Sequence, residues 1–289
     1  MKSCYAAPTP SFGARQSNPI SVHRWNHDLL ESVSLSPSDL ISLDFFMTAF
    51  VWFDTLSCAT TGSQPSCPGW LLPLLHDESG RIQLYKLMGC KNWVIAIIME
   101  VAGLENWKVE CQQNGNLSMR ELARRATCIE QRLNDCLARN AEVMPLSSEL
   151  RQDGGVELEI RSVTDVFGCA ALTYLHVVLS GAYPELPEIR ESVQRTIDAF
   201  RAVRECHWVR NLVWPFCIAG CMAMPPSEGE FRGIAHSAQV RGRGLKNLES
   251  AVAIVEECWA ARAESGERVS GPCDWKTAMK RLGISVLLI

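Results

Sequence analysis

The chain has 289 residues, of which 47% are hydrophobic and 21% are charged, and its net charge is -4 at pH 7. This length is enough to bury one large core or two small ones, and the composition is that of a globular protein, which argues against disorder. The acidic balance argues against a free-standing nucleic-acid-binding domain, because such domains are usually basic.

The 13 cysteines could indicate disulfides, but their setting argues against them. Several stand inside apolar helical patterns, where a free cysteine behaves as a small hydrophobic residue. These are Cys128, Cys136, Cys169, Cys217, Cys221 and Cys258. Met1–Pro19 contains no apolar core of a secretory signal, and no apolar run approaches the ~20 residues that span a bilayer. We therefore expect a reducing compartment and no contact with a membrane.

The N-terminal residues 1–35 begin with a stretch rich in proline and serine, and they predict a flexible lead-in to a single domain over residues 36–289. Ser36 is the expected cap of the first helix. Pro37 then occupies the first helical position, where its missing N–H has no effect.

The segment Leu40–Cys58 predicts a long helix rich in aromatic residues. Its larger apolar side chains follow helical spacing, at Leu43, Phe46, Met47, Phe50 and Phe53. Asp44 and Asp54 are its only charged residues. We expect these two carboxylates to cap a neighbouring helix or to pair with an arginine, which is commoner than a catalytic role for such residues.

The middle of the chain predicts a loop and then further helices. Thr60–Pro73 is rich in Gly, Ser and Pro and is typical of a loop. Ile82–Trp107 is strongly apolar, and Gly89-Cys90 could divide it into two helices. Ser118 and Glu121 form a capping box that opens an amphipathic helix.

Apolar stripes predict the remaining helices. Two of these stripes run over Val163–Val178 and Ile189–Val203, and a third forms a last long helix over Leu245–Trp259. Ser227 to Glu230 matches a second capping box. A short closing helix is expected over Trp275–Leu282.

A central helix is predicted where the chain carries no charge, between Asn211 and Ser227. A helix that is apolar on every side is buried on every side. Pro215 fits its first turn, and Gly220 is small enough to let another helix approach closely. Since no segment shows sustained two-residue alternation, we predict an all-α fold: a bundle of roughly eight to ten helices around this short buried helix.

Sequence signatures of catalysis are missing from these residues. There is no phosphate-binding loop, dinucleotide-binding glycine motif, nucleophile elbow or His-Glu-x-x-His. A metal site built from Cys206, His207, Cys217 and Cys221 is conceivable, but two of these residues lie in the helix expected to be buried. We therefore predict no enzyme, no metal and no cofactor.

Two groups of residues are candidates for contact with a ligand or partner. The first could line an apolar pocket, although ordinary core is the commoner role for such residues; it consists of Trp52, Trp93, Trp214 and Met222. The second is a basic run that could touch phosphate, although it also suits a helix start that pairs with Glu249; it consists of Arg241, Arg243 and Lys246.

Three blocks of sequence together resemble the fungal-specific transcription factor regulatory domain of zinc-cluster (Zn₂Cys₆) regulators, and most closely the regulators of fungal sexual development. The blocks are Phe45-Phe-Met-Thr-Ala-Phe-Val-Trp-Phe-Asp-Thr-Leu-Ser-Cys58, Leu87-Met-Gly-Cys-Lys-Asn-Trp93, and Trp214-Pro-Phe-Cys-Ile-Ala-Gly-Cys221 followed later by Asp274-Trp275. The resemblance covers Leu40 to Ile289.

The resemblance implies a nuclear module that regulates transcription through other transcription regulators, a homodimer partner or a small-molecule signal. It transfers no catalytic residue. The family's zinc-cluster module begins Cys-x₂-Cys-x₆-Cys, whereas Cys4 is followed next by Cys58 here. Contact with DNA is therefore expected to be indirect unless a zinc-cluster module is supplied. An all-α enzyme and a small-molecule sensor with an apolar pocket remain the alternatives.

Overall fold

The computed structural model describes residues 36–66, 68–76, 80–142, 154–203, 211–241, 246–264 and 273–289, and over these residues the chain folds entirely as helices and their connections. This confirms the all-α prediction. The helices are α2 Pro37–Thr61, α3 Pro68–His76, α4 Leu84–Met88, α5 Asn92–Gln113, α6 Met119–Ala141, α7 Gly154–Ser180, α8 Pro187–Ala202, α9 Val213–Cys221, α10 Pro225–Arg241, α11 Lys246–Glu264 and α12 Trp275–Leu282.

The chain divides into two compact units, Met1–Leu43 and Asp44–Ile289. The described part of the first unit is the start of α2, where the Asp39 N–H donates to Ser36 Oγ over 3.3 Å and the Ser36 N–H donates to the Asp39 carboxylate over 3.0 Å. This reciprocal cap confirms the predicted helix start. The predicted lead-in, residues 1–35, lies outside the described residues.

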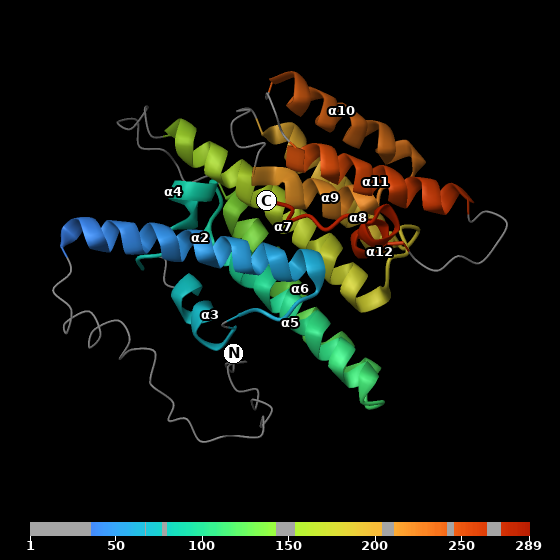
Figure 1. Cartoon of the computed structure of the whole chain (residues 1–289), viewed down its shortest axis with the longest axis horizontal. Coiled ribbons are helices and arrows are strands. Elements are labelled where there is room, and N and C mark those ends of the chain that lie inside the picture. Colours follow the sequence, from blue (N-terminus) through green and yellow to red (C-terminus); the bar gives the residue numbers. More distant parts are fainter. Residues whose placement is uncertain are drawn as a thin grey trace. The chain divides into compact units, whose positions relative to one another are not determined.

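The second unit is organised around α9. All nine residues of this helix are buried, and α7, α8, α10, α11 and α12 pack against it (Figure 1). Trp259 of α11 donates its Nε1–H to the Gly220 carbonyl over 2.9 Å. The Arg262 guanidinium donates to the carbonyls of Cys221 and Ala223 over 2.6 and 2.8 Å, and so satisfies backbone groups that a helix end leaves unpaired. The predicted central helix is confirmed.

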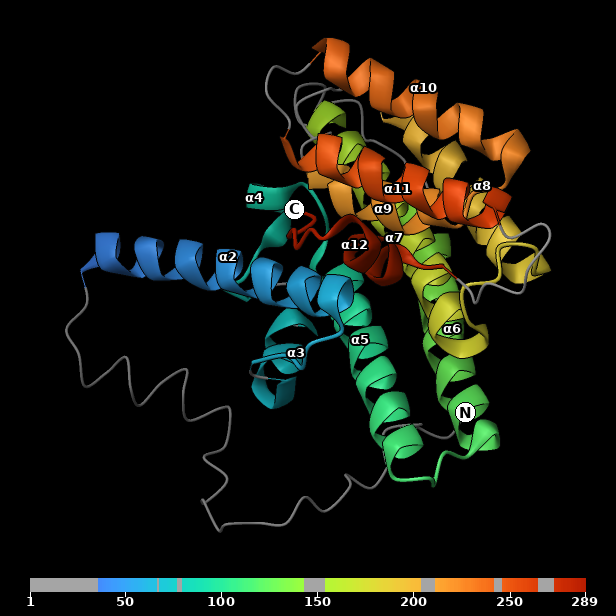
Figure 2. The same ribbon diagram turned by 45° about the vertical axis from the view of Figure 1, so that its right-hand side comes forward.

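A second layer is formed by α5 and α6, which run side by side and pack on α7 (Figure 2). Ser118 caps α6 by accepting from the Glu121 N–H, as predicted. The Glu121 carboxylate turns instead to Arg124 and Arg125. At the crossing with α7, a side chain on Gly168 would lie 2.7 Å from a methyl carbon of Leu137, so a glycine is needed for the two helices to approach this closely.

Two local predictions were wrong. Part of the expected loop Thr60–Pro73 folds as α3, because Pro68 suits a first helical turn and Leu75 becomes buried near α5. The capping box at Ser227 does not form, because α10 already begins at Pro225 and Ser227 lies within it. In both cases a proline opens the helix.

Two helices are long and apolar enough to cross a membrane by length and composition alone: α2, and Gly155–Ser180 of α7. The sequence analysis did not find them, because scattered Ser, Thr and charged residues interrupt each apolar run. In α7, 83% of the relevant window is buried inside the protein, which is the signature of a core helix. In α2 the buried share is 28%.

Candidate functional site

Aromatic side chains from four helices form a row of ring contacts through the second unit. Trp52 of α2 meets Phe167 of α7 edge to face, with ring centroids 5.2 Å apart. Phe167 stacks on Trp214 of α9 at 6.2 Å, and Trp214 meets Tyr174 of α7 at 6.0 Å. Tyr174 then meets Trp275 of α12 at 5.7 Å. We call these five residues the aromatic row.

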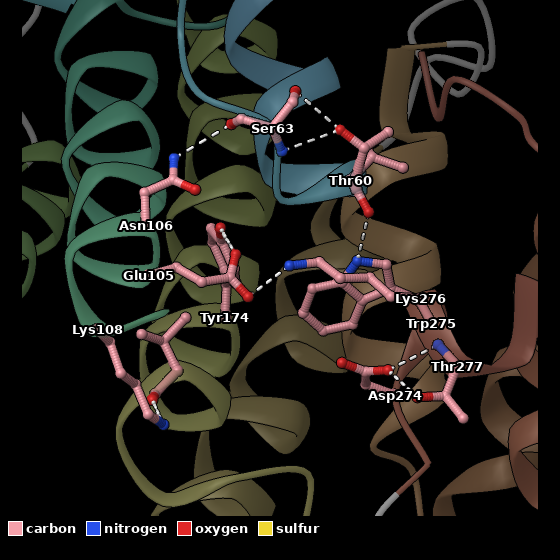
Figure 3. Close-up of polar contacts among 12 residues, drawn as sticks. Thr60, Ser63, Glu105, Asn106, Lys108, Tyr174, Asp274, Trp275, Lys276 and Thr277 are labelled. Carbon is pink, nitrogen blue, oxygen red and sulfur yellow. Dashed lines mark hydrogen bonds and ion pairs between the residues drawn. The ribbon is translucent and has the colours of Figure 1, made fainter. Parts of the chain in front are cut away.

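Local sequence places each ring. Phe167 and Tyr174 are two helical turns apart on α7, so they project from the same face of that helix. Trp214 stands in the first turn of α9. Trp275 is the first residue of α12, whose cap Asp274 accepts from the Thr277 N–H over 2.8 Å (Figure 3). The row therefore joins α2, α7, α9 and α12.

A polar network lies beside one end of the row (Figure 3). The Glu105 carboxylate of α5 accepts from the Tyr174 hydroxyl over 2.7 Å and pairs with the Lys276 ammonium of α12. Trp275 Nε1–H donates to the Thr60 carbonyl over 3.0 Å, which ties α12 to the end of α2. We call Glu105, Tyr174 and Lys276 the latch, because they hold α12 against α5 and α7.

Burial affects the pKa of one latch residue, Tyr174. Tyr174 is fully buried, and burial together with the neighbouring Glu105 carboxylate raises its pKa well above the usual value. Its hydroxyl therefore stays protonated and able to donate at physiological pH. The Lys276 ammonium also lies 5.5 Å from the centroid of the Trp275 ring, within the range of a cation–π contact.

The indole N–H of Trp214 is unusual. The residue is fully buried at the middle of the aromatic row, and its Nε1 has no hydrogen-bond partner among the described residues. An unpaired buried donor costs about 1–3 kcal/mol. Ring packing on Phe167 and Tyr174 offsets that cost, so Trp214 acts as a packing residue in this structure.

The four predicted pocket residues are only partly brought together. Trp52 and Trp214 share a common neighbour, because both rings contact Phe167. Trp93 of α5 is partly buried and lies beside Gly168 of α7, the residue that follows Phe167. Met222 is buried just after the end of α9. These residues are parts of a close-packed core, and their role in binding a ligand or partner stays a prediction.

The predicted basic run is only partly described. Arg243 lies outside the described residues, and Arg241 is described only as the last backbone position of α10. Lys246 begins α11 with an exposed side chain. A contact of these three residues with phosphate therefore stays a prediction.

Of the two carboxylates of α2, Asp44 pairs with an arginine, as predicted, whereas Asp54 bonds to a serine. Asp44 pairs with Arg81 over 2.7 Å, and Asp54 accepts from the Ser66 hydroxyl over 2.8 Å. Glu257 pairs with Arg281 over 2.7 Å. Over the described ranges, no group of three or more His, Cys, Asp and Glu side chains is placed to hold a metal ion.

The latch is the feature that sequence reasoning missed. Glu105 and Lys276 are separated by 171 positions, so no spacing pattern links them. The available signal was weak, because Glu105 is one of two acidic residues, with Glu100, on the apolar part of α5. Asp274-Trp275 was recognised as part of the family resemblance, without a structural role.

Comparison with known proteins identifies the family. The model of the fungal-specific transcription factor domain matches residues 17–289. The chain belongs to this family. The match confirms the family, the fungal-specific transcription factor domain, to which the three sequence blocks pointed.

Three curated relatives match most of this chain, but each match covers only part of the relative's own length. The trichothecene biosynthesis transcription regulator of Trichoderma arundinaceum is 34% identical over 89% of this chain and 56% of its own length. The regulator of the same name in Fusarium sporotrichioides is 31% identical over 95% of this chain and 63% of its own length. The ustiloxin B cluster transcription factor of Aspergillus flavus is 30% identical over 91% of this chain and 48% of its own length. The chain thus spans about half the length of these relatives. No solved structure matches it.

The relatives are named as transcription regulators and not as enzymes. None of the three names refers to sexual development, so the predicted closeness to regulators of that process stays a prediction. The same holds for the zinc-cluster module and for the nuclear location.

Proposed function

We propose that this chain is the regulatory domain of a nuclear transcription regulator, which controls gene expression through contacts with other proteins and catalyses no reaction. The observation that carries the proposal is the family match over residues 17–289. The structure supports it: the partly buried latch joins α5, α7 and α12, and Asp44 and Glu257 pair with arginines of the chain.

The names of the relatives suggest the class of genes under control. Two of the relatives described above are named for the biosynthesis of trichothecenes, and one for the ustiloxin B cluster. We propose that this chain likewise regulates the genes of a biosynthetic pathway. Sequence-specific contact with DNA would come from a zinc-cluster module or from a partner protein that carries one.

A reporter assay tests this function. The full chain is fused to an unrelated DNA-binding domain in a fungal host, and expression of a reporter gene with the matching promoter site is compared with that given by the DNA-binding domain alone. We expect the fusion to raise or lower expression severalfold. A fusion that occupies the promoter, as shown by chromatin immunoprecipitation, and leaves expression unchanged would overturn the proposal.

The direction of the change in reporter expression separates activation from repression.

A fusion carrying Gly220→Leu serves as the control, because it disturbs the packing of α9 without altering the DNA-binding part. Its effect on the reporter should fall towards that of the DNA-binding domain alone.

A further inference from the structure

The helix α2 displays a row of large aromatic side chains to solvent. Phe46 is 66% exposed, Phe50 39% and Phe53 42%. These three residues define what we call the phenylalanine stripe. Burying such side chains is a main source of stability in a folded protein, so a row of them in water is a feature that needs an explanation.

The stripe has the spacing of a helix-pairing surface. Phe46, Phe50, Phe53 and Ser57 follow one another at intervals of four, three and four residues, which is the spacing of the a and d positions in a coiled coil. The other side of α2 is already used: Val51, Trp52 and Leu56 are buried in the second unit. The helix therefore has two apolar faces, of which the described residues of its own chain cover one.

The size of the exposed face is in the range of functional surfaces. With Phe45, which is 51% exposed, the rings leave on the order of 400 Å² of apolar surface in water, since a buried aromatic side chain covers about 150–250 Å². The largest apolar patch on a typical monomer measures about 300–600 Å² and is often functional.

The charges of α2 leave this face neutral. Beyond its first turn the helix carries only Asp44 and Asp54. Asp44 is held by Arg81, and Asp54 accepts from both the backbone N–H and the hydroxyl of Ser66. Two such faces can therefore meet around a two-fold axis without bringing like charges together at the centre of the contact.

We propose that the phenylalanine stripe is a homodimer interface, in which the α2 helices of two chains pack against each other. Two facing stripes with Phe45 bury on the order of 800 Å² of ring surface, and the partly exposed Met47, Ala49 and Ser57 bring the total to about 1,000 Å², the size of a weak, concentration-dependent interface. A two-fold dimer uses the same surface on both chains, which a single unpaired stripe supplies. The proposal is independent of the regulatory function proposed above.

A lipid membrane is a poorer match for this face. The length and hydropathy of α2 would allow it to span a bilayer. However, one side of the helix packs within its own protein, and the Asp44–Arg81 pair would have to leave water. Membrane binding is therefore treated as an opposing outcome of the test.

The test is the mass of the full chain in solution, measured by sedimentation velocity over a range of protein concentrations. We expect the wild-type chain to reach twice its 32.1 kDa mass. The double variant Phe50→Glu/Phe53→Glu should remain a monomer with an unchanged circular dichroism spectrum. Leu158→Ser is the matched control, since this leucine of α7 is also exposed, by 48%, but lies off the stripe; it should dimerise like the wild type.

A milder variant keeps the test valid if the double variant does not fold. Phe50→Ala should raise the dissociation constant of the dimer at least about tenfold, as expected for an aromatic residue at the centre of an interface. The proposal is overturned by a wild-type chain that stays monomeric at every concentration, or by a dimer that both stripe variants retain. It is also overturned by a monomer that sediments with phosphatidylcholine–phosphatidylserine vesicles and loses this binding in the double variant.

Discussion

At the scale of single residues, the latch differs from the ion pairs on the surface. The side chains of Lys276 and Glu105 are 17% and 20% exposed, whereas those of Arg201 and Asp198 are 55% and 57% exposed. Water screens an exposed pair, so such pairs contribute little to stability. A shielded carboxylate that loses its partner keeps most of its desolvation penalty.

We predict that Lys276→Met lowers the free energy of unfolding by about 1–3 kcal/mol, because the partly buried Glu105 carboxylate then loses the ammonium that pairs with it. The measurement is urea unfolding at pH 7, followed by tryptophan fluorescence. Arg201→Met is the control, and it should change the stability by no more than about 0.5 kcal/mol. Equal effects of the two variants would show that the latch is no stronger than a surface pair.

At the scale of elements, α9 acts as the hub of the bundle because its small residues allow close contact. A side chain on Gly220 would lie 3.0 Å from Val255 of α11 and 3.3 Å from Phe231 of α10. The Trp259 indole also donates to the Gly220 carbonyl, so α11 approaches the backbone of α9 directly. The packing of these helices therefore depends on the absence of a side chain at this position.

We predict that Gly220→Leu destabilises the protein by about 1–3 kcal/mol or more through overpacking. The measurement is the melting temperature, followed by circular dichroism. Gly229→Leu is the matched control, because this glycine is exposed on α10 and a side chain there would meet no atom within 4 Å. The control should be neutral or slightly stabilising, since leucine favours helix more than glycine does. An unchanged melting temperature for Gly220→Leu would contradict the close contact with α11.

At the scale of the whole molecule, the charge and the fold both suit protein contacts better than DNA. The net charge is -4, and several arginines of the described helices pair with carboxylates of the chain, among them Arg124, Arg132 and Arg201. Affinity for DNA depends first on basic side chains that neutralise phosphates. The phenylalanine stripe, in contrast, offers a neutral apolar surface.

We predict that the full chain alone shows no sequence-selective binding to DNA. The measurement is a gel shift at physiological salt, about 0.15 M, with fragments from promoters of biosynthetic genes. The chain fused to a known DNA-binding domain serves as the positive control. A tight complex that persists at higher salt and prefers one promoter sequence would contradict this prediction.

The sequence by itself determined the parts of the structure that depend on neighbours along the chain. Ser36 and Ser118 were recognised as caps because a cap bonds to a residue three positions away. The buried helix α9 and the closing helix α12 followed from composition and spacing over a few turns. The family followed from short blocks of sequence in a fixed order.

The tertiary structure alone decided which faces meet. The stripe at Phe46, Phe50 and Phe53 was visible in the sequence, but α2 is apolar all round, so periodicity could not show that Val51 and Trp52 enter the core while the stripe faces water. The latch likewise depends on Glu105 and Lys276, which only folding brings together. The physical reason is that local hydrogen bonds and propensities fix a helix within a few residues, whereas the choice of its buried side depends on packing against distant segments.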